Sequence, residues 1–511
     1  MQTRLAELLA SLGVATDVAA GLDMETSARA TVLAVELAHD LGMRGDALRG
    51  VYYTAMLRFV GCTSLAAETA EKGGGDDMRT LGDLVLPDSG KPAQMLGAIV
   101  GKVGRGTGLF GRIGAVARTL ADPGFPKQLA IAHCAQAVAL AEHLGAPPNT
   151  VIALEQIYER FDGKGGPHKL KGEQISRSVR IVHVALRAEI HRRIEGSEAA
   201  LAVLAARKNG ELDGALVDTF LANGAERLAR VDGSVWDAVL AAEPAPHIEL
   251  DGERLARVAE AFARFAHLKS PFTLGHSEAV AARAVAAAEV TGMPAVAREQ
   301  LRIAALLHDL GRVAVPNGIW DKPAALSPIE RERVHDHAAQ TQKILARSPL
   351  LEPYARLAAS DHERLDGSGY ARGARGSDLS AAMNLLAAAD VYQALLEDRP
   401  HRRAHATDDA AKILTDEAAA GRLDRDAVRA VLTSADAKVD DRSTYPANLT
   451  EREVEVLRLL AQGLSNKEIG ARLHISARTA GNHIAHIYEK TGVSTRASAA
   501  LFAVQHRLIV A

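Results

Sequence analysis

The feature that most constrains this chain is an internal repeat. Val51–Gly61 (VYYTAMLRFVG) aligns without a gap on Leu301–Gly311 (LRIAALLHDLG), at a shift of 250 residues. Tyr158–Pro167 (YERFDGKGGP) resembles His362–Ala371 (HERLDGSGYA), at a shift of 204 residues. Two ungapped matches in the same order predict one fold present twice in tandem. The difference between shifts of 250 and 204 leaves 46 extra residues in the first copy, between about 63 and 131.

The residue types favour helices over sheets. Apolar residues make up 48% of the 511 residues and aromatic residues only 4%, with many alanines and leucines, which are strong helix formers. A chain of this length supports two to four domains. Polar, proline-containing segments near 245 and 440 are typical of linkers. We therefore predict an all-α protein in three parts, covering residues 1–245, 246–440 and 441–511.

The second copy contains histidines and aspartates in the combination that metal sites use. His308 and Asp309 close an apolar, helix-forming stretch, so both side chains can bind one metal. The second oxygen of Asp309 remains available for a neighbouring metal. Five more candidate ligands lie in or beside helix-forming stretches, namely His276, His337, Asp361, His362 and Asp390. A mixed set of imidazoles and carboxylates suits divalent ions such as Fe or Mn.

These residues and their surroundings resemble the HD-GYP family of all-helical metal phosphohydrolases, which cleave cyclic di-GMP. The matching segments, from about 269 to 403, are GHSEAVA, HDLGR, the Lys-Pro pair at 322–323, the HDH run, HERLDGSGY and ADVYQALLEDRPHR. The resemblance implies two divalent metal ions. His276, His308, Asp309 and Asp390 would hold one, and Asp309, His337, Asp361 and His362 the other. It also implies a metal-activated water as nucleophile, Asp309 at the catalytic centre, and Lys322 and Arg312 as candidates to hold the phosphate.

Several departures from the family pattern bear on metal and substrate. Asp361 stands where the family has a histidine, which predicts a changed metal preference, because an aspartate can still ligate. The signature tripeptide at 369–371 reads GYA and lacks its proline, and the usual Asp-Ala after Val-Tyr is Gln393-Ala394. Phe272 occupies the position at which three-metal members have a glutamate, so two metals are expected. The substrate is then cyclic di-GMP or a related nucleotide.

The first copy lacks nearly all of these ligands. At the two shifts, the positions of the seven candidate ligands are occupied by Thr26, Arg58, Phe59, His133, Ile157, Tyr158 and Leu186. Only His133 is conserved between the copies, and one imidazole does not hold a metal. His39-Asp40 imitates the His-Asp pair, but it falls opposite residues 289–290 inside a helix, away from the site. We therefore predict a degenerate, non-catalytic first copy.

The insert of the first copy is rich in glycine. Gly104 and Gly106, with Lys102, Arg105 and Arg112 around them, have the composition of a phosphate-binding loop. However, the segment has neither the GK[ST] signature nor a strand before it, so it is not a P-loop. A surface loop is the favoured interpretation, and an effector pocket stays open as a hypothesis.

The C-terminal segment has the pattern of a helix-turn-helix domain. Thr450–Glu453 and Ser465–Glu468 are capping boxes that open two short helices, and Ser476 begins a third. Residues 446–511 hold two lysines and six arginines against five glutamates, a local charge of about +3 that suits phosphate contacts. The sequence resembles the LuxR/NarL-type DNA-binding domain of four helices, although Thr479-Ala480-Gly481 departs from the family's usual lysine there. The residues predicted to contact double-stranded DNA are Lys467, Arg478, Thr479, Asn482 and His486.

Composition also bears on location and partners. Two cysteines, Cys62 and Cys134, indicate a reducing compartment. The N-terminal segment carries Glu7 and Asp17, which argues against a signal peptide. No stretch of about 20 uncharged apolar residues is present. We expect a cytoplasmic protein without a membrane partner.

Two functions from different classes remain open at this stage. The first is a metal-dependent phosphodiesterase, acting on cyclic di-GMP or a related nucleotide, whose ligand or turnover controls transcription. The second is a transcription factor whose HD-type domain senses a nucleotide without hydrolysing it. Retention of the metal ligands in the second copy favours hydrolysis. Because LuxR-type domains bind paired half-sites, the chain is also expected to form a homodimer.

Overall fold

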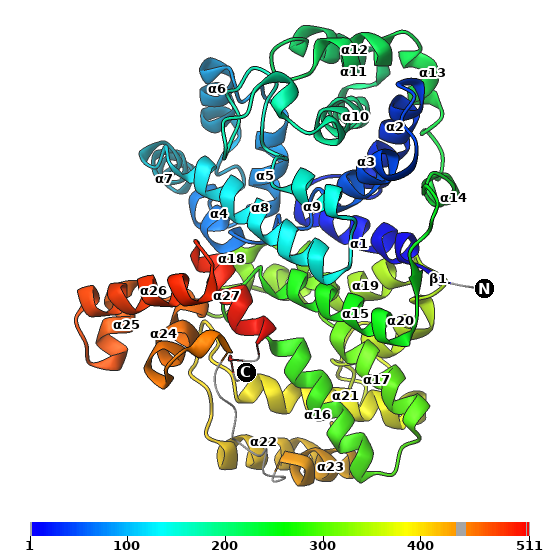
Figure 1. Cartoon of the computed structure of the whole chain (residues 1–511). Helices are drawn as coiled ribbons and strands as arrows, with labels where there is room; N and C mark the ends of the chain where they lie inside the picture. The colour runs from blue at the N-terminus through cyan, green and yellow to red at the C-terminus, as the bar shows by residue number, and fades with distance from the viewer. Residues whose placement is uncertain (1–2, 436–445, 507, 510–511) are drawn as a thin grey trace. The chain divides into compact units, whose positions relative to one another are not determined.

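The computed structural model describes residues 3–435, 446–506 and 508–509 (Figure 1). Within these ranges the regular secondary structure is helical apart from one short antiparallel pair, β1 (Thr3–Arg4) with β2 (Glu249–Leu250), and two isolated bridges. The predicted all-α class is therefore confirmed. The chain divides into two compact units, Met1–Val258 with Pro316–Gly318, and Ala259–Val315 with Ile319–Ala511. The three-part boundaries at 245 and 440 stay a prediction.

The first unit contains the first copy of the repeat. Its helices outside the insert are α1 (Leu5–Ala19), α2 (Thr26–Asp40), α3 (Gly45–Leu57), α8 (Phe125–His143), α9 (Pro148–Leu154), η1 (Gly172–Gln174), α10 (Arg177–Glu195), α11 (Ser197–Arg207), α12 (Gly214–Leu221), α13 (Gly224–Ala229) and α14 (Trp236–Ala241). Helix α10 packs against α2, α3 and α11, and its apolar side chains, such as Val184 and Ile190, are buried there.

The insert of the first copy folds into four helices, α4 (Ala66–Gly73), α5 (Asp77–Val85), α6 (Pro92–Lys102) and α7 (Leu109–Ala121). The loop expected for the glycine-rich segment is present at Gly104 and Gly106, whereas the residues on either side of it are helical. Only residues 103–108 form a turn, in which Gly104 and Gly106 adopt φ values of 70° and 93°. Glycine is favoured in this left-handed region, which explains its use in a tight connection between two helices.

The second unit holds the second copy and the C-terminal domain. The helices of the second copy are α15 (Gly252–His267), α16 (His276–Val290), α17 (Ala295–Leu307), η2 (Leu310–Ala314), α18 (Asn317–Trp320), α19 (Pro328–Leu345), α20 (Glu352–Ala358), η3 (Gly376–Asp378), α21 (Ala381–Leu395), α22 (Thr407–Ala419) and α23 (Arg425–Ala435). The first residues of α15 and two residues of α18 belong to the other unit.

The helix bounds repeat between the copies as the sequence predicts. Helices α2 and α3 have the same bounds as α16 and α17 after a shift of 250 residues, and α9 and η1 match α20 and η3 after a shift of 204. The glycine after the His-Asp position has the same role in both copies. A Cβ on Gly311 would lie 1.9 Å from the carbonyl oxygen of His337, and one on Gly61 would lie 2.2 Å from that of His133. The backbones approach so closely that only glycine fits.

The C-terminal domain consists of η4 (Pro446–Asn448), α24 (Glu451–Ala461), α25 (Asn466–Leu473), α26 (Ala477–Thr491) and α27 (Arg496–Gln505). Both predicted capping boxes are formed, at Thr450 and at Ser465, and Ser476 caps α26. Leu457, Ile469 and Ile487 are buried in the core that joins the helices. The predicted four-helix arrangement is confirmed.

Candidate metal centre

Five helices, three of them through their own residues and two through the turns that follow them, position the seven candidate ligands. His276 is the first residue of α16, and His308 and Asp309 stand between α17 and η2. His337 lies in α19, and Asp390 in α21. Asp361 and His362 follow α20. Because Gly311 has no side chain, the turn after Asp309 approaches α19 closely, and Asp309 lies next to His337.

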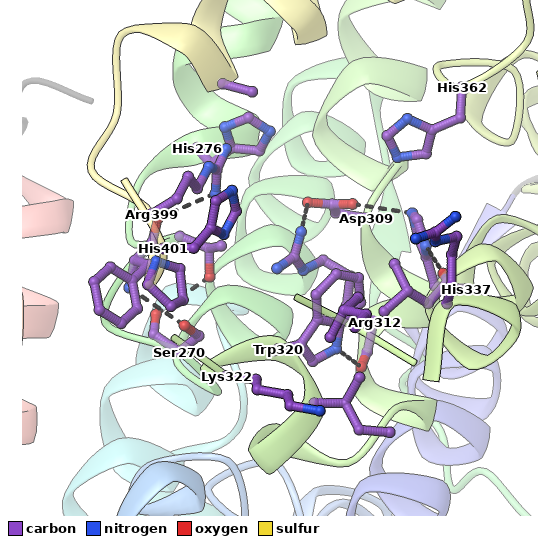
Figure 2. A pocket seen from close by; sticks show the side chains of 18 of the residues that line it. Ser270, His276, Asp309, Arg312, Trp320, Lys322, His337, His362, Arg399 and His401 are labelled. Atoms are coloured by element: carbon purple, nitrogen blue, oxygen red, sulfur yellow. Dashed lines mark hydrogen bonds and ion pairs between the residues drawn. The ribbon is translucent and has the colours of Figure 1, made fainter. Parts of the chain in front are cut away.

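The structure brings all seven predicted ligands together. Figure 2 labels four of them, His276, Asp309, His337 and His362. Asp390 Oδ1 lies 3.0 Å from Nε2 of His276 and 3.7 Å from Nε2 of His308. Asp309 lies between the imidazoles, with Oδ2 3.7 Å from Nε2 of His308 and Oδ1 3.5 Å from Nε2 of His337. Three overlapping groups have potential ligand atoms within 4.8 Å of one another, namely His276–His308–Asp390, His308–Asp309–Asp361 and His337–Asp361–His362.

The orientation of three imidazoles suits metal binding. Nδ1 of His308 donates to the carbonyl oxygen of Ala305 at 2.7 Å, and Nδ1 of His337 donates to that of Val334. A carbonyl can only accept, so these nitrogens carry hydrogen and Nε2 is left for the centre. In His276, Nδ1 lies 2.9 Å from both oxygens of Glu397. Histidines that bind metals are typically fixed in this way through the second ring nitrogen.

Buried polar atoms without hydrogen bonds mark the centre itself. Among the described residues, Nε2 of His308, Nε2 of His337 and both carboxylate oxygens of Asp361 are buried and accept or donate no hydrogen bond. Such atoms cost about 1–3 kcal/mol each unless something satisfies them. A divalent cation is the group that satisfies imidazole nitrogens and carboxylate oxygens together. The residues present therefore fit a metal.

The charges of the centre favour a cation. Burial lowers the pKa of His308, but the carboxylates of Asp309, Asp390 and Asp361 outweigh burial and raise that pKa to about 10. Burial and the neighbouring carboxylates raise the pKa of Asp361 well above its ordinary value. The field that favours a proton on His308 also favours a metal, which takes the place of that proton when it binds.

Two residues that the sequence did not single out contact the ligands. Glu397 is buried and follows α21, where Arg399 pairs with it at 2.7 Å and Nε2 of Gln393 donates to it at 3.0 Å. His267, the last residue of α15, places Nε2 3.1 Å from Oδ2 of Asp309. Burial lowers the pKa of His267 to about 4 despite the nearby carboxylate. His267 therefore donates to Asp309 as a neutral imidazole.

A cavity of about 480 Å³ opens onto the centre, a size that fits a small organic ligand. Its walls include the ligands His276, Asp309, His337, His362 and Asp390. Arg312 and Lys322 also line it, as predicted. Arg312 lies 3.3 Å from Asp309, with its guanidinium 3.7 Å from the centroid of the Trp320 ring, and Lys322 pairs with Glu330 at 2.6 Å. Arg331, Arg399 and His401 add positive or titratable groups to the walls.

The altered signature tripeptide forms part of the same cavity. The Tyr370 ring stacks on His335 with centroids 4.0 Å apart and on His362 with centroids 4.6 Å apart. His335 thus supports His362 through Tyr370. Ala371 has φ of 96°, a value that proline cannot adopt. The loop conformation therefore differs from one built around a proline at this position.

The corresponding position in the first copy is closed by side chains. His133 Nε2 lies 2.8 Å from the carbonyl oxygen of Arg58, and its Nδ1 lies 2.9 Å from the hydroxyl of Tyr158. The buried guanidinium of Arg58 donates to the carbonyl oxygen of Ile157 at 2.7 Å. Both nitrogens of His133 are thus engaged. No group of three candidate metal ligands occurs in the described part of this copy.

The predicted DNA-contacting residues share an exposed surface. Arg478, Thr479, Asn482 and His486 are exposed on α26, and Lys467 is exposed on α25. Ala480, Ile484 and Ile487 of α26 face the core. Helix α26 is thus amphipathic, with its polar face outward, as a recognition helix requires.

Comparison with known proteins places this geometry in a family. The HD domain family matches residues 260–427, and the bacterial regulatory proteins of the luxR family match residues 447–503. The chain is 30% identical over 421 residues to the 3'3'-cGAMP-specific phosphodiesterase 3 of Vibrio cholerae, which covers 80% of this chain and 90% of that protein. The chain belongs to the HD-GYP-type HD-domain phosphodiesterases. It is thus a hydrolase of phosphoric diesters that also carries a LuxR-type domain.

Other members of the phosphodiesterase family agree with this assignment. The crystal structure of a cyclic GMP-AMP-specific phosphodiesterase of V. cholerae superposes with a TM-score of 0.59 at 26% identity, covering 87% of this chain and all of that chain. The cyclic di-GMP phosphodiesterase of Thermotoga maritima is 36% identical over 129 residues, which is 25% of this chain and 35% of that protein. The similarity to the first structure extends beyond the second copy, in keeping with a tandem arrangement.

Proposed function

We propose that the second copy hydrolyses a cyclic dinucleotide containing guanine, at a centre that holds two divalent metal ions, Fe or Mn. The observation that carries this proposal is the convergence of all seven candidate ligands, four of whose buried polar atoms have no hydrogen-bond partner. A sensor that does not hydrolyse its ligand has no need of this set, and the first copy has lost it. The relatives named for cyclic GMP-AMP and cyclic di-GMP support the substrate class.

The chain's own residues have distinct tasks in this reaction. The metals would activate water and offset the charge that develops on phosphorus. His267 donates to Asp309 and orients the carboxylate that reaches both groups of ligands. Arg312 and Lys322 face the cavity and exchange their carboxylate partners for a substrate phosphate. Trp320, Phe272 and Tyr370 supply aromatic surface to the same cavity, which suits nucleobases.

The decisive experiment is chromatography of nucleotides after incubation of the purified protein with cyclic di-GMP or 3'3'-cGAMP. Mn or Fe(II) is added, and Asp309→Ala is assayed in parallel. Linear dinucleotide or mononucleotide from the wild-type protein alone supports the proposal, and the preferred substrate identifies the base. Intact substrate from both proteins, with bound metal demonstrated, contradicts it in favour of a nucleotide sensor.

We further propose that nucleotide binding or turnover controls DNA binding by the C-terminal domain, as a homodimer on paired half-sites. Helix α26 would enter the major groove with Arg478, Thr479, Asn482 and His486, while Lys467 contacts phosphate. The test measures affinity for selected operator DNA with and without cyclic dinucleotide, using Asp309→Ala to prevent turnover. Equal affinities in all conditions contradict the coupling. A monomer at every concentration, with and without DNA, contradicts the dimer.

A further inference from the structure

Exposed apolar side chains are concentrated on one helical hairpin of the insert. Eleven large apolar side chains are exposed among the described residues, and six of them lie on α6 and α7. These six are Leu96, Val100, Leu109, Phe110, Ile113 and Leu120. Phe110 is 89% exposed. Single exposed apolar residues are common on protein surfaces, but a cluster of this kind indicates a binding surface. Figure 1 shows α6 and α7 in blue, next to α4 and α5.

Helix α7 packs against α4 through the small, fully buried side chain of Ala115 and through polar side chains. Nε of Arg118 donates to the carbonyl oxygen of Glu71 at 3.1 Å. The hydroxyl of Thr119 donates to the carbonyl oxygen of Lys72 at 3.4 Å. Leu109, Ile113 and Leu120 recur at the spacing of a single helical face, and all three are exposed. A helix on the surface of a globular protein normally shows the opposite arrangement, with its apolar face toward the core.

The same hairpin is strongly basic. Residues 90–121 contain two lysines and three arginines but no aspartate or glutamate, in a chain whose net charge is −3. The two lysines pair with Asp88 and Asp83, just outside this range, at 3.6 Å each, so the basic character rests on the three arginines. Arg105 donates to the carbonyl oxygen of Gly101, and Arg112 to those of Val100 and Gly101. Carbonyl groups satisfy the hydrogen bonds of these guanidinium groups and leave their positive charge in place.

We propose that the α6–α7 hairpin is an attachment surface for an anionic phospholipid bilayer. Apolar side chains beside lysines and arginines are the composition of helices that lie in the membrane interface. Leu109, Phe110 and Ile113 would enter the acyl boundary, and the arginines would contact lipid phosphates. The attachment is peripheral, since no helix among the described residues is long and apolar enough to span a bilayer.

Charge distinguishes this partner from two others. A two-fold contact with a second copy would bring the same basic residues face to face, which is unfavourable. A nucleic acid would compensate the charge but would set Phe110 and Leu109 against phosphates. A bilayer with anionic lipids satisfies both the charge and the apolar stripe. The expectation of no membrane partner was drawn from the absence of a spanning segment, and it did not consider a surface contact of this kind.

The test is co-sedimentation of the full-length protein with vesicles. Vesicles of phosphatidylcholine with phosphatidylglycerol are compared with vesicles of phosphatidylcholine alone. We expect binding to the anionic vesicles only, weakened by added salt. Replacing two inserted side chains, in Phe110→Ser with Ile113→Ser, should weaken binding by about tenfold or more. The matched control is Ile194→Ser, an equally accessible isoleucine of α10 that is 55% exposed.

A charge variant and a fold control complete the design. The double substitution Arg105→Gln with Arg112→Gln should weaken binding to anionic vesicles. Arg177→Gln, at the exposed first residue of α10, should not. All variants should retain the circular dichroism spectrum and the phosphodiesterase activity of the wild type. Failure to sediment with anionic vesicles overturns the proposal, as does equal binding to neutral ones. Unchanged binding by the Phe110 and Ile113 variant also overturns it. Loss of a dimer in that variant, by light scattering, assigns the hairpin to a second copy instead.

Discussion

Glu397 accepts a hydrogen bond from His276, with both carboxylate oxygens 2.9 Å from Nδ1. The bond leaves Nε2 of His276 directed at Asp390, 3.0 Å away. Gln393, which replaces the usual aspartate of the family, donates to Glu397. Glu397 thus supplies a carboxylate beside His276, although the family's aspartate one turn earlier is replaced by Gln393. Glu397 is a positioning residue for His276.

Removing the charge of Glu397 should weaken metal binding. In Glu397→Gln the neutral amide oxygen can still accept from Nδ1 of His276, but it no longer increases the basicity of the ring, so we expect Mn affinity to fall by about ten- to a hundredfold. Equilibrium dialysis with metal analysis measures this without reference to activity. Glu352→Gln, at an exposed position of α20, is the control and should bind metal like the wild type. Wild-type metal affinity in Glu397→Gln would show that the contact is only structural.

The candidate ligands that converge in the structure could be selected from the sequence, whereas the residues that support them could not. His276, His308-Asp309 and Asp390 stand in motifs that can be recognised by their order and spacing in a single sequence. Glu397 and His267 belong to no such motif, and their roles arise when α15 and the turn after α21 pack around the centre. The loss of ligands in the first copy was also readable, because a repeat aligns each position with its functional counterpart. Only the structure shows how the guanidinium of Arg58 lies in that space, where it donates to a carbonyl oxygen.

The insert shows why glycine-rich segments mislead. The loop interpretation covered the segment of Gly104 and Gly106, and no helix was predicted on either side of it, because the glycines and scattered leucines between 90 and 121 lack the pattern of a helix that buries its apolar face. The structure contains helices there, but their apolar side faces outward. Methods based on periodicity assume that the apolar face is buried, and they do not recognise a helix whose partner lies outside the chain.

The two conserved histidines of the repeat should behave differently. His337→Ala removes a ligand with an unpaired Nε2, so bound metal and phosphodiesterase activity should both be lost. His133→Ala leaves the hydroxyl of Tyr158 and a carbonyl oxygen unpaired, which should cost about 1–3 kcal/mol of stability without changing the metal content. Metal analysis and urea denaturation of both variants separate the two roles. Metal loss in His133→Ala would contradict the assignment of the first copy as non-catalytic.

A buried ion-pair cluster makes the first unit sensitive to acid. Burial raises the pKa of Glu211, but Arg187, Arg207 and Arg160 outweigh it and lower the pKa from 4.5 to about 2. Because the folded pKa is depressed, this stabilisation is present above pH 4.5 and is lost as the pH falls toward 2. It amounts to at most about 3 kcal/mol.

Glu211→Gln should therefore lower the free energy of unfolding by about 3 kcal/mol at neutral pH, since it leaves buried arginines without a counter-charge. The variant should also lose most of the decrease in stability between pH 4.5 and 2. Urea denaturation at a series of pH values measures both effects. Glu226→Gln breaks an exposed pair with Arg230, and it should change stability by less than about 1 kcal/mol. Equal effects of the two substitutions would contradict the role of burial.

The exposed face of α26 predicts two kinds of DNA contact that salt and sequence can separate. Asn482 points outward from the recognition helix, and an amide pairs with a base edge, so Asn482→Ala should relax the preference at one base pair by about 1–3 kcal/mol. Lys467 lies in the first turn of α25, from which a lysine reaches phosphate. Lys467→Ala should weaken all sequences alike and reduce the slope of log affinity against log salt by about 1. Lys412→Ala, at an exposed lysine of α22, is the control for charge.

Fluorescence anisotropy over a salt series, with specific and scrambled duplexes, distinguishes the outcomes. An unchanged salt slope in Lys467→Ala would remove that residue from the interface, and unchanged base preference in Asn482→Ala would mean that α26 does not read sequence through this position.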